Sequence, residues 1–240
     1  MSDSETTRDT LLRGRVILHQ PRRGFRSSLD PVLLAGFLSP PYGHFLDIGA
    51  GTGAVSFLLL AKDDQATGVA VEIQDRLATL AQSGLRENTF ADRLLVVNSD
   101  ARQLGESFEG AFDLVATNPP FRPVGVGNLP GHSQRAMAHH EVTLTLREWA
   151  QVAYRCLRPE GRLGVIFPSD RLEELSTVLA QTGLPVVATR LVLPRSGDPP
   201  MRCLVEARKT SLPSDPSRLP SLVVHGLKGY TPELLEMLGE

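Results

Sequence analysis

Short apolar segments alternate with helical segments through most of this chain, and the alternation limits the possible folds more than any other feature. Strands that alternate with helices at these intervals predict an α/β fold with a mainly parallel sheet. The last two strands have no helix between them, which favours an antiparallel hairpin at one edge of that sheet. We therefore expect a seven-stranded sheet in a three-layer αβα arrangement. The expected strands are 44–48, 67–71, 94–97, 112–117, 164–168, 186–193 and 203–207, and the expected helices are 54–61, 75–88, 144–156 and 172–181.

The two ends of the chain are expected to be less regular. Residues 1–10 are expected to be a disordered N-terminal segment. A helix is expected to begin at Asp30, which suits an N-cap before Pro31. Residues 211–220 are rich in Pro and Ser and predict a linker. A short strand over 222–224 and a final helix over 232–238 are expected to follow it.

Composition excludes several classes of protein. Lys and Arg number 25 against 27 Asp and Glu, so a net charge of −2 excludes a protein that is basic all over. Cys156 and Cys203 have no partner motif, which predicts two buried thiols and no zinc site. The polar N-terminus does not resemble a signal peptide, and the most apolar stretch, 54–61, is too short to span a membrane. We expect a cytoplasmic protein with no metal and no membrane partner; its oligomeric state stays open.

A glycine loop joins the strand 44–48 to the helix that follows it. Its spacing is G-x-G-x-G, through Gly49, Gly51 and Gly53, and Asp47 precedes it. Glycines at such a turn let a ligand approach the backbone closely, and amides at the helix N-terminus favour an electron-rich group. An acid at this position suits a ligand with a positive amino group better than a dinucleotide pyrophosphate. The P-loop signature is absent from the sequence.

Two further acids close the next two strands. Glu72 ends the strand 67–71, where a carboxylate can accept hydrogen bonds from both hydroxyls of a ribose. Asp100 follows the strand 94–97 and can accept from an adenine amino group. Ligands of open α/β sheets bind at the carboxyl ends of the strands, where these acids lie.

Together the glycine loop and the acids resemble the class I S-adenosylmethionine-dependent methyltransferases. The resemblance implies a Rossmann-like fold and S-adenosyl-L-methionine as cofactor, with the glycine loop at its methionine end, Glu72 at its ribose and Asp100 at its adenine. The cofactor-binding residues that it implies are Arg26, Asp30, Asp47, Gly49, Ala50, Gly51, Thr52, Gly53, Glu72, Ile73, Asp100, Ala101 and Asn118.

The segment Asn118, Pro119, Pro120, Phe121 follows the strand 112–117 and is the expected catalytic motif. Prolines lack an N–H group and restrict φ, so the nearby carbonyls are rigidly held. The Asn118 side-chain oxygen and the Pro119 carbonyl can accept the hydrogens of an exocyclic amine, and Phe121 can stack on its ring. The motif resembles that of methyltransferases acting on adenine, guanine, cytosine or glutamine nitrogens.

Flanking segments narrow the resemblance to one family. Residues 24–35 are similar to the segment that precedes the glycine loop in the valine-tRNA (adenine-N6)-methyltransferases, and 199–207 and 229–233 are similar to its later segments. The resemblance spans about 12–238 and implies one methyltransferase domain over 1–240. It divides into a basic segment with a cofactor-covering helix (1–43), a catalytic core (44–210) and a C-terminal extension (211–240). The implied substrate is the adenine 3′ of the anticodon in a tRNA.

Two stretches without acids, 10–29 and 121–140, favour an RNA partner because arginines can meet phosphates. Alternative functions remain open here: a glutamine-N5 methyltransferase acting on release factors, an rRNA guanine-N2 methyltransferase, or a non-catalytic RNA-binding subunit. Nucleoside analysis of a methylated product separates these possibilities. The candidate substrate-binding residues are Arg22, Arg23, Arg122, His139 and His140.

Overall fold

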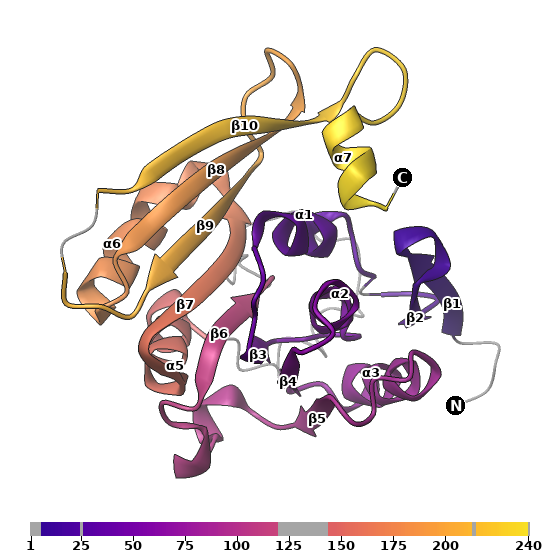
Figure 1. Ribbon diagram of the computed structural model, residues 1–240, viewed down its shortest axis with the longest axis vertical. Helices are drawn as coiled ribbons and strands as arrows, with labels where there is room; N and C mark the ends of the chain where they lie inside the picture. The colour runs from indigo at the N-terminus through magenta and orange to yellow at the C-terminus, as the bar shows by residue number, and fades with distance from the viewer. Residues whose placement is uncertain (1–5, 25, 120–143, 213–214, 240) are drawn as a thin grey trace, which may run out of the picture.

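A computed structural model describes residues 6–24, 26–119, 144–212 and 215–239 (Figure 1). Within these residues, eight strands form one sheet in the order β10-β8-β9-β7-β6-β3-β4-β5. Neighbouring strands are parallel, except that β9 pairs antiparallel with both β7 and β8. The strands are β3 (His44–Ile48), β4 (Thr67–Glu72), β5 (Leu94–Asn98), β6 (Phe112–Thr117), β7 (Leu157–Pro168), β8 (Val186–Arg195), β9 (Arg202–Arg208) and β10 (Ser217–His225).

Helices cover both faces of the sheet, which confirms the three-layer αβα arrangement (Figure 1). The strands supply side chains alternately to two cores: Phe45 and Leu114 pack with the first group of helices, and Leu46 and Val115 with the second. The first group is α1 (Asp30–Phe37), α2 (Ala54–Lys62), α3 (Asp75–Glu87) and α7 (Pro232–Met237), and the second is α5 (Leu146–Cys156) and α6 (Leu172–Thr182). Short 3-10 turns η2 (Ala101–Gln103), η3 (Glu106–Phe108) and η4 (Ser169–Arg171) follow β5 and β7.

The predicted count of seven strands was wrong, because β10 adds an eighth strand outside the β8–β9 hairpin. The expected strand over 222–224 is present, but it begins at Ser217, inside the segment predicted to be a linker. The first half of β10 is exposed and polar and is held by backbone pairing with β8. Pro220 falls at the register shift between Leu219 and Leu222, a place where an edge strand tolerates proline.

The prediction of a disordered N-terminal segment was also wrong for residues 6–10. Strand β1 (Thr6–Leu11) pairs antiparallel with β2 (Val16–Pro21) through the 3-10 turn η1 (Leu12–Gly14). Asn88, just after α3, fixes this hairpin to the core. Its Oδ1 accepts from the Ile17 amide, and its Nδ2 donates to the Ile17 carbonyl, both at 2.7 Å. This tertiary contact supplies order that the polar sequence of β1 does not predict.

The C-terminal helix α7 forms where a helix was expected, and it packs on the body of the protein. Thr231 caps it by accepting from the Leu234 amide, and Leu234 is fully buried. A Cβ built on Gly36 of α1 would lie 2.6 Å from the Met237 sulfur, so α1 and α7 approach closely at this glycine. The chain after Pro220 therefore folds against the helix that precedes the glycine loop.

Candidate functional site

Four parallel strands bring the expected site residues to one edge of the sheet. The strands β6, β3, β4 and β5 are neighbours, so their carboxyl ends lie side by side. Asp47 lies near the end of β3, Glu72 ends β4, Asp100 follows β5 and Asn118 follows β6. The structure thus gathers the three acids and the asparagine at the edge where such sheets bind ligands.

The glycine loop turns sharply between β3 and α2. Gly49, Gly51 and Gly53 have φ values of 74°, 58° and 86°, in the left-handed region that favours glycine. The amides of Gly49 and Ala50 donate to the Val71 carbonyl at 2.9 and 3.0 Å. The loop is therefore fixed to the end of β4, with no side chain on three of its residues.

Asp47 is buried, with an exposed fraction of 1%. One of its two carboxylate oxygens accepts hydrogen bonds from Ser56. Its Oδ2 accepts from the Ser56 hydroxyl at 2.7 Å and from the Ser56 amide at 3.1 Å. Its Oδ1 is buried without a hydrogen-bond partner among the described residues, as is Oγ1 of Thr52 in the loop. Burial outweighs the bonds from Ser56 and raises the pKa of Asp47 to about 7, and nearby Glu72 adds to the increase.

Glu72 connects the end of β4 to the glycine loop. Its Oε2 accepts from the Gly51 amide and its Oε1 from the Gln74 amide, both at 2.8 Å. The side chain is 4% exposed, so these main-chain donors hold a buried carboxylate in one orientation. Each carboxylate oxygen has about two acceptor positions, so a carboxylate held in this way can bind more than one donor.

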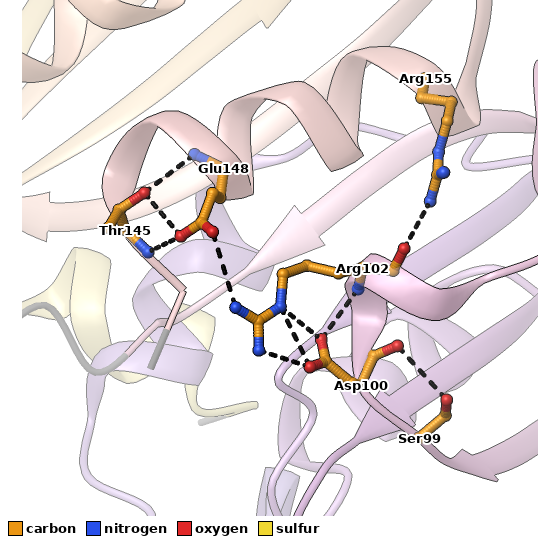
Figure 2. Close-up of polar contacts among 6 residues, drawn as sticks. All are labelled: Ser99, Asp100, Arg102, Thr145, Glu148 and Arg155. Atoms are coloured by element: carbon orange, nitrogen blue, oxygen red, sulfur yellow. Dashed lines mark hydrogen bonds and ion pairs between the residues drawn. The ribbon is translucent and has the colours of Figure 1, made fainter. Parts of the chain in front are cut away.

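Asp100 is held by Arg102 (Figure 2). Its Oδ1 accepts from the Arg102 amide at 2.9 Å, and its Oδ2 from Nη2 of the same residue at 2.6 Å. These hydrogen bonds keep the pKa of Asp100 below its ordinary value. The neighbouring residues predicted at the cofactor differ in exposure: Ala101 is buried, and Ile73 after Glu72 is 47% exposed.

The end of β6 carries the first half of the expected catalytic motif. Thr117 donates from Oγ1 to the Ile48 carbonyl at 2.8 Å, which fixes the end of β6 to the end of β3. Asn118 and Pro119 follow and are half-buried. The other predicted residues of this region lie outside the described residues; they are Pro120, Phe121, Arg122, His139 and His140.

Arg26, before α1, and Asp30, at its start, both have protein partners. Arg26 donates to Asp9 and to the Thr7 hydroxyl, both at 2.8 Å, so it holds its segment to the N-terminal hairpin. Asp30 was expected as the N-cap of α1, but it is the first helical residue, after Leu29, and it pairs with Arg202 at 3.2 Å.

Arg22 and Arg23 lie in the same segment and are exposed to solvent. Arg22 reaches the Thr6 carbonyl at 3.4 Å through Nη2. Their segment connects β2 to α1, whose first residue pairs with Arg202 at the start of β9. Because β9 runs antiparallel to β7, its start lies at the carboxyl edge of the parallel strands.

Sequence reasoning missed the residues that hold the acids. Ser56 binds Asp47, Arg102 binds Asp100 and Arg202 binds Asp30. For Arg102 only the backbone contact follows a common local pattern, in which an Asp side chain accepts from the amide two residues later. Ser56 and Arg202 follow no such pattern, because their contacts depend on how the helix and the sheet pack.

The prediction of two buried thiols is confirmed within the part of the chain that the structure describes. Cys156 and Cys203 are buried and unpaired, and burial raises their pKa values to about 11 and about 12. The described histidines, cysteines and acids form no group suited to a metal ion. Among the described helices, none combines the length and apolar character that crossing a membrane requires.

Comparisons with known proteins agree with this geometry. Residues 30–181 match the family model described as methyltransferase small domain. A Porphyromonas gingivalis protein named tRNA1(Val) (adenine(37)-N6)-methyltransferase is 33% identical over 93% of this chain and 91% of its own length. A Pasteurella multocida protein of the same name is 30% identical over 82% of each chain.

Solved structures show the same fold at lower sequence identity. A predicted O-methyltransferase from Agrobacterium tumefaciens superposes with a TM-score of 0.69 at 21% identity, over 87% of this chain and 94% of that one. M. jannaschii TYW2 in complex with AdoMet superposes with a TM-score of 0.59 at 12% identity, over 87% of each chain.

Proposed function

Since the chain belongs to the tRNA1(Val) (adenine(37)-N6)-methyltransferase family, we propose that it methylates the exocyclic N6 of an adenine in a tRNA anticodon loop. The observation that carries the proposal is the gathering of Asp47, Glu72, Asp100 and Asn118 at one edge of the sheet. The proposed cofactor is S-adenosylmethionine, which supplies an electrophilic methyl group when bound.

Unpartnered polar atoms support this cofactor. An ammonium group would give the buried Oδ1 of Asp47 the donor that it lacks among the described residues, and Thr52 offers a second buried oxygen. Glu72 would accept from the ribose hydroxyls and Asp100 from the adenine amino group. The left-handed glycines let the ligand lie against the main chain of the loop. These residues fit the proposed cofactor because its ammonium group, its ribose hydroxyls and its adenine amino group would each meet an acceptor of suitable chemistry.

Asn118 and Pro119 would hold the amine that receives the methyl group. The nitrogen of an exocyclic amine is a poor nucleophile because its lone pair is delocalised into the ring. Acceptance of its two hydrogens by the Asn118 side chain and the Pro119 carbonyl favours a pyramidal nitrogen with an available lone pair. Orientation of this kind contributes up to about 7–11 kcal/mol. A strong general base is unnecessary, because the alkylated nitrogen loses its proton readily.

Exposed arginines support an RNA partner. Arg22 and Arg23 are exposed in the segment that leads into α1, where they can contact phosphates. A base in a single-stranded loop is unpaired, so it can be splayed into an active site at a lower free-energy cost than a duplex base. An anticodon loop presents such a base.

Product analysis tests the function directly. The purified protein is incubated with methyl-labelled S-adenosylmethionine and either bulk unmodified tRNA or release factors, and labelled nucleosides are then separated. We expect N6-methyladenosine from tRNA alone. Asn118→Ala should reduce turnover by at least about 100-fold, from lost positioning, while it still binds the cofactor. Label in protein alone, or N2-methylguanosine as the product, would contradict the proposal.

A further inference from the structure

Arg102 contacts both oxygens of the Asp100 carboxylate. Its Nε lies 3.1 Å from Oδ1 and 3.0 Å from Oδ2, and its Nη2 lies 2.6 Å from Oδ2 (Figure 2). The backbone amide of Arg102 adds a fourth contact, to Oδ1 at 2.9 Å. One residue therefore fixes the plane of this carboxylate from its side chain and from its main chain together.

Glu148 restrains the same guanidinium. Its Oε1 lies 3.5 Å from Nη1 of Arg102, the nitrogen that does not contact Asp100. Glu148 is itself fixed, because its other oxygen accepts from the amide and hydroxyl of Thr145 in the capping box of α5 (Figure 2). The guanidinium is thus held between the residue that follows β5 and the first turn of α5.

Exposure differs along this chain of contacts. The side chain of Asp100 is 13% exposed, Arg102 is 30% and Glu148 is 40%. Arg102 and Glu148 also line a surface hollow of about 280 Å³ with Gln151, Val152 and Arg155. Water therefore screens the Glu148 contact more than the Asp100 contact, and the bidentate pair with Asp100 is the stronger one.

We propose that Arg102 is a positioning residue, which holds Asp100 in the orientation that accepts the adenine amino group of the cofactor. This inference rests on the proposed function, which supplies that cofactor. Arg102 uses three donors but makes four contacts, because Nε is shared by both oxygens. The amino group would replace the shared Nε contact at one oxygen, while Nη2 and the backbone amide keep the carboxylate from rotating away.

Two ligands that differ only in the adenine amino group test this positioning role. S-adenosylhomocysteine carries the adenine amino group, and its 6-deamino purine analogue lacks only that group. The affinity ratio of the two ligands, measured by calorimetry, reports the hydrogen bond that Asp100 accepts. In the natural chain we expect the amino ligand to bind about 10- to 150-fold more tightly, as for a hydrogen bond to a charged group.

Arg102→Met should reduce this ratio to within about threefold of unity, and Asp100→Asn should do the same, since both lose the oriented carboxylate. Arg102→Lys keeps the charge without the bidentate geometry and should give an intermediate ratio. Arg155→Met is the matched control. Arg155 lines the same hollow and contacts the Arg102 carbonyl, Cys156 and, at 3.9 Å, Glu109, but among the described residues it has no contact with the Asp100 carboxylate, so the natural ratio should be kept.

Several results would overturn the inference. An unchanged ratio in Arg102→Met and Arg102→Lys would remove the positioning role and leave the proposed function intact. Equal weakening of both ligands would assign Arg102 a structural role only. Equal binding of both ligands by the natural chain would exclude Asp100 as the adenine acceptor. Failure of the natural chain to bind either ligand would refute the proposed cofactor itself.

Discussion

The raised pKa of Asp47 can be tested by measuring how the stability of the protein depends on pH. Asp47 is a buried acid whose Oδ1 has no partner among the described residues, and burial raises its pKa from 3.8 to about 7. Asp47→Asn keeps the shape of the side chain, and the amide oxygen can still accept from Ser56. The variant removes the group that titrates, and its NH2 group takes the place of Oδ1.

The sign of the effect follows from the direction of the shift. A carboxyl whose pKa is higher in the folded state binds its proton more tightly there, so ionisation of Asp47 favours unfolding. The natural chain should lose stability as pH rises from about 4 to about 7. A shift of roughly three units at 1.36 kcal/mol each corresponds to about 4 kcal/mol. Asp47→Asn should be more stable by up to this amount at pH 8, and equal to the natural chain at pH 4.

Denaturant unfolding followed by circular dichroism between pH 4 and pH 8 measures the difference. A gain of 4 kcal/mol would raise the melting temperature by roughly 8–16 °C for a chain of this length. Asp64→Asn is the control, because it makes the same substitution at an exposed position. A variant that is no more stable than the natural chain at pH 8, or a difference that persists at pH 4, would refute the reasoning.

Further predictions concern the RNA surface and the C-terminal helix. Arg22→Gln with Arg23→Gln should weaken tRNA binding and lower the salt slope by about 1.4, at about 0.7 per phosphate contact. The control pair, Arg158→Gln with Arg208→Gln, lies near the amino ends of the parallel strands and should leave the salt slope of tRNA binding unchanged. The same salt slope in both double variants would place the RNA elsewhere. Gly36→Val should lower the free energy of unfolding by about 1–3 kcal/mol through its clash with Met237. Met237→Ala should recover most of that loss in a double-mutant cycle, and additive effects would contradict the contact.

The parts of the fold that were predicted correctly have a strong local pattern. The strand His44–Ile48 and the start of α2 at Ala54 match the expected bounds, because an apolar strand, a glycine loop and an apolar helix follow one another directly. Strands β1 and β10 lack such a pattern. The first is polar and depends on Asn88, and the second begins as an exposed strand with a proline in it. Tertiary pairing orders both segments, and it overrides the local signal.

The residues of the candidate site also fall into those that the sequence could predict and those that it could not. Strand ends are readable from the sequence, so the acids at one edge of the sheet could be predicted. Their partners could not, because Ser56 reaches Asp47 only after α2 packs over β3. Arg26 and Asp30 were expected at the cofactor, yet both side chains make ion pairs with the protein, to Asp9 and Arg202. A role for either at the ligand would require its ion pair to rearrange.

The three acids of the site are held by three different means, and the difference predicts how a ligand would lie. Asp100 is compensated by a guanidinium, and Glu72 accepts from main-chain amides. Asp47 has no ion pair among the described residues, and its charge is opposed by burial. A cationic group on a ligand therefore gains most at Asp47, where a counter-charge is missing, and least at Asp100. Neutral hydroxyls and a neutral amine suit the other two acids. The charge pattern thus favours the ammonium end of the proposed cofactor at the glycine loop, and its neutral groups at Glu72 and Asp100.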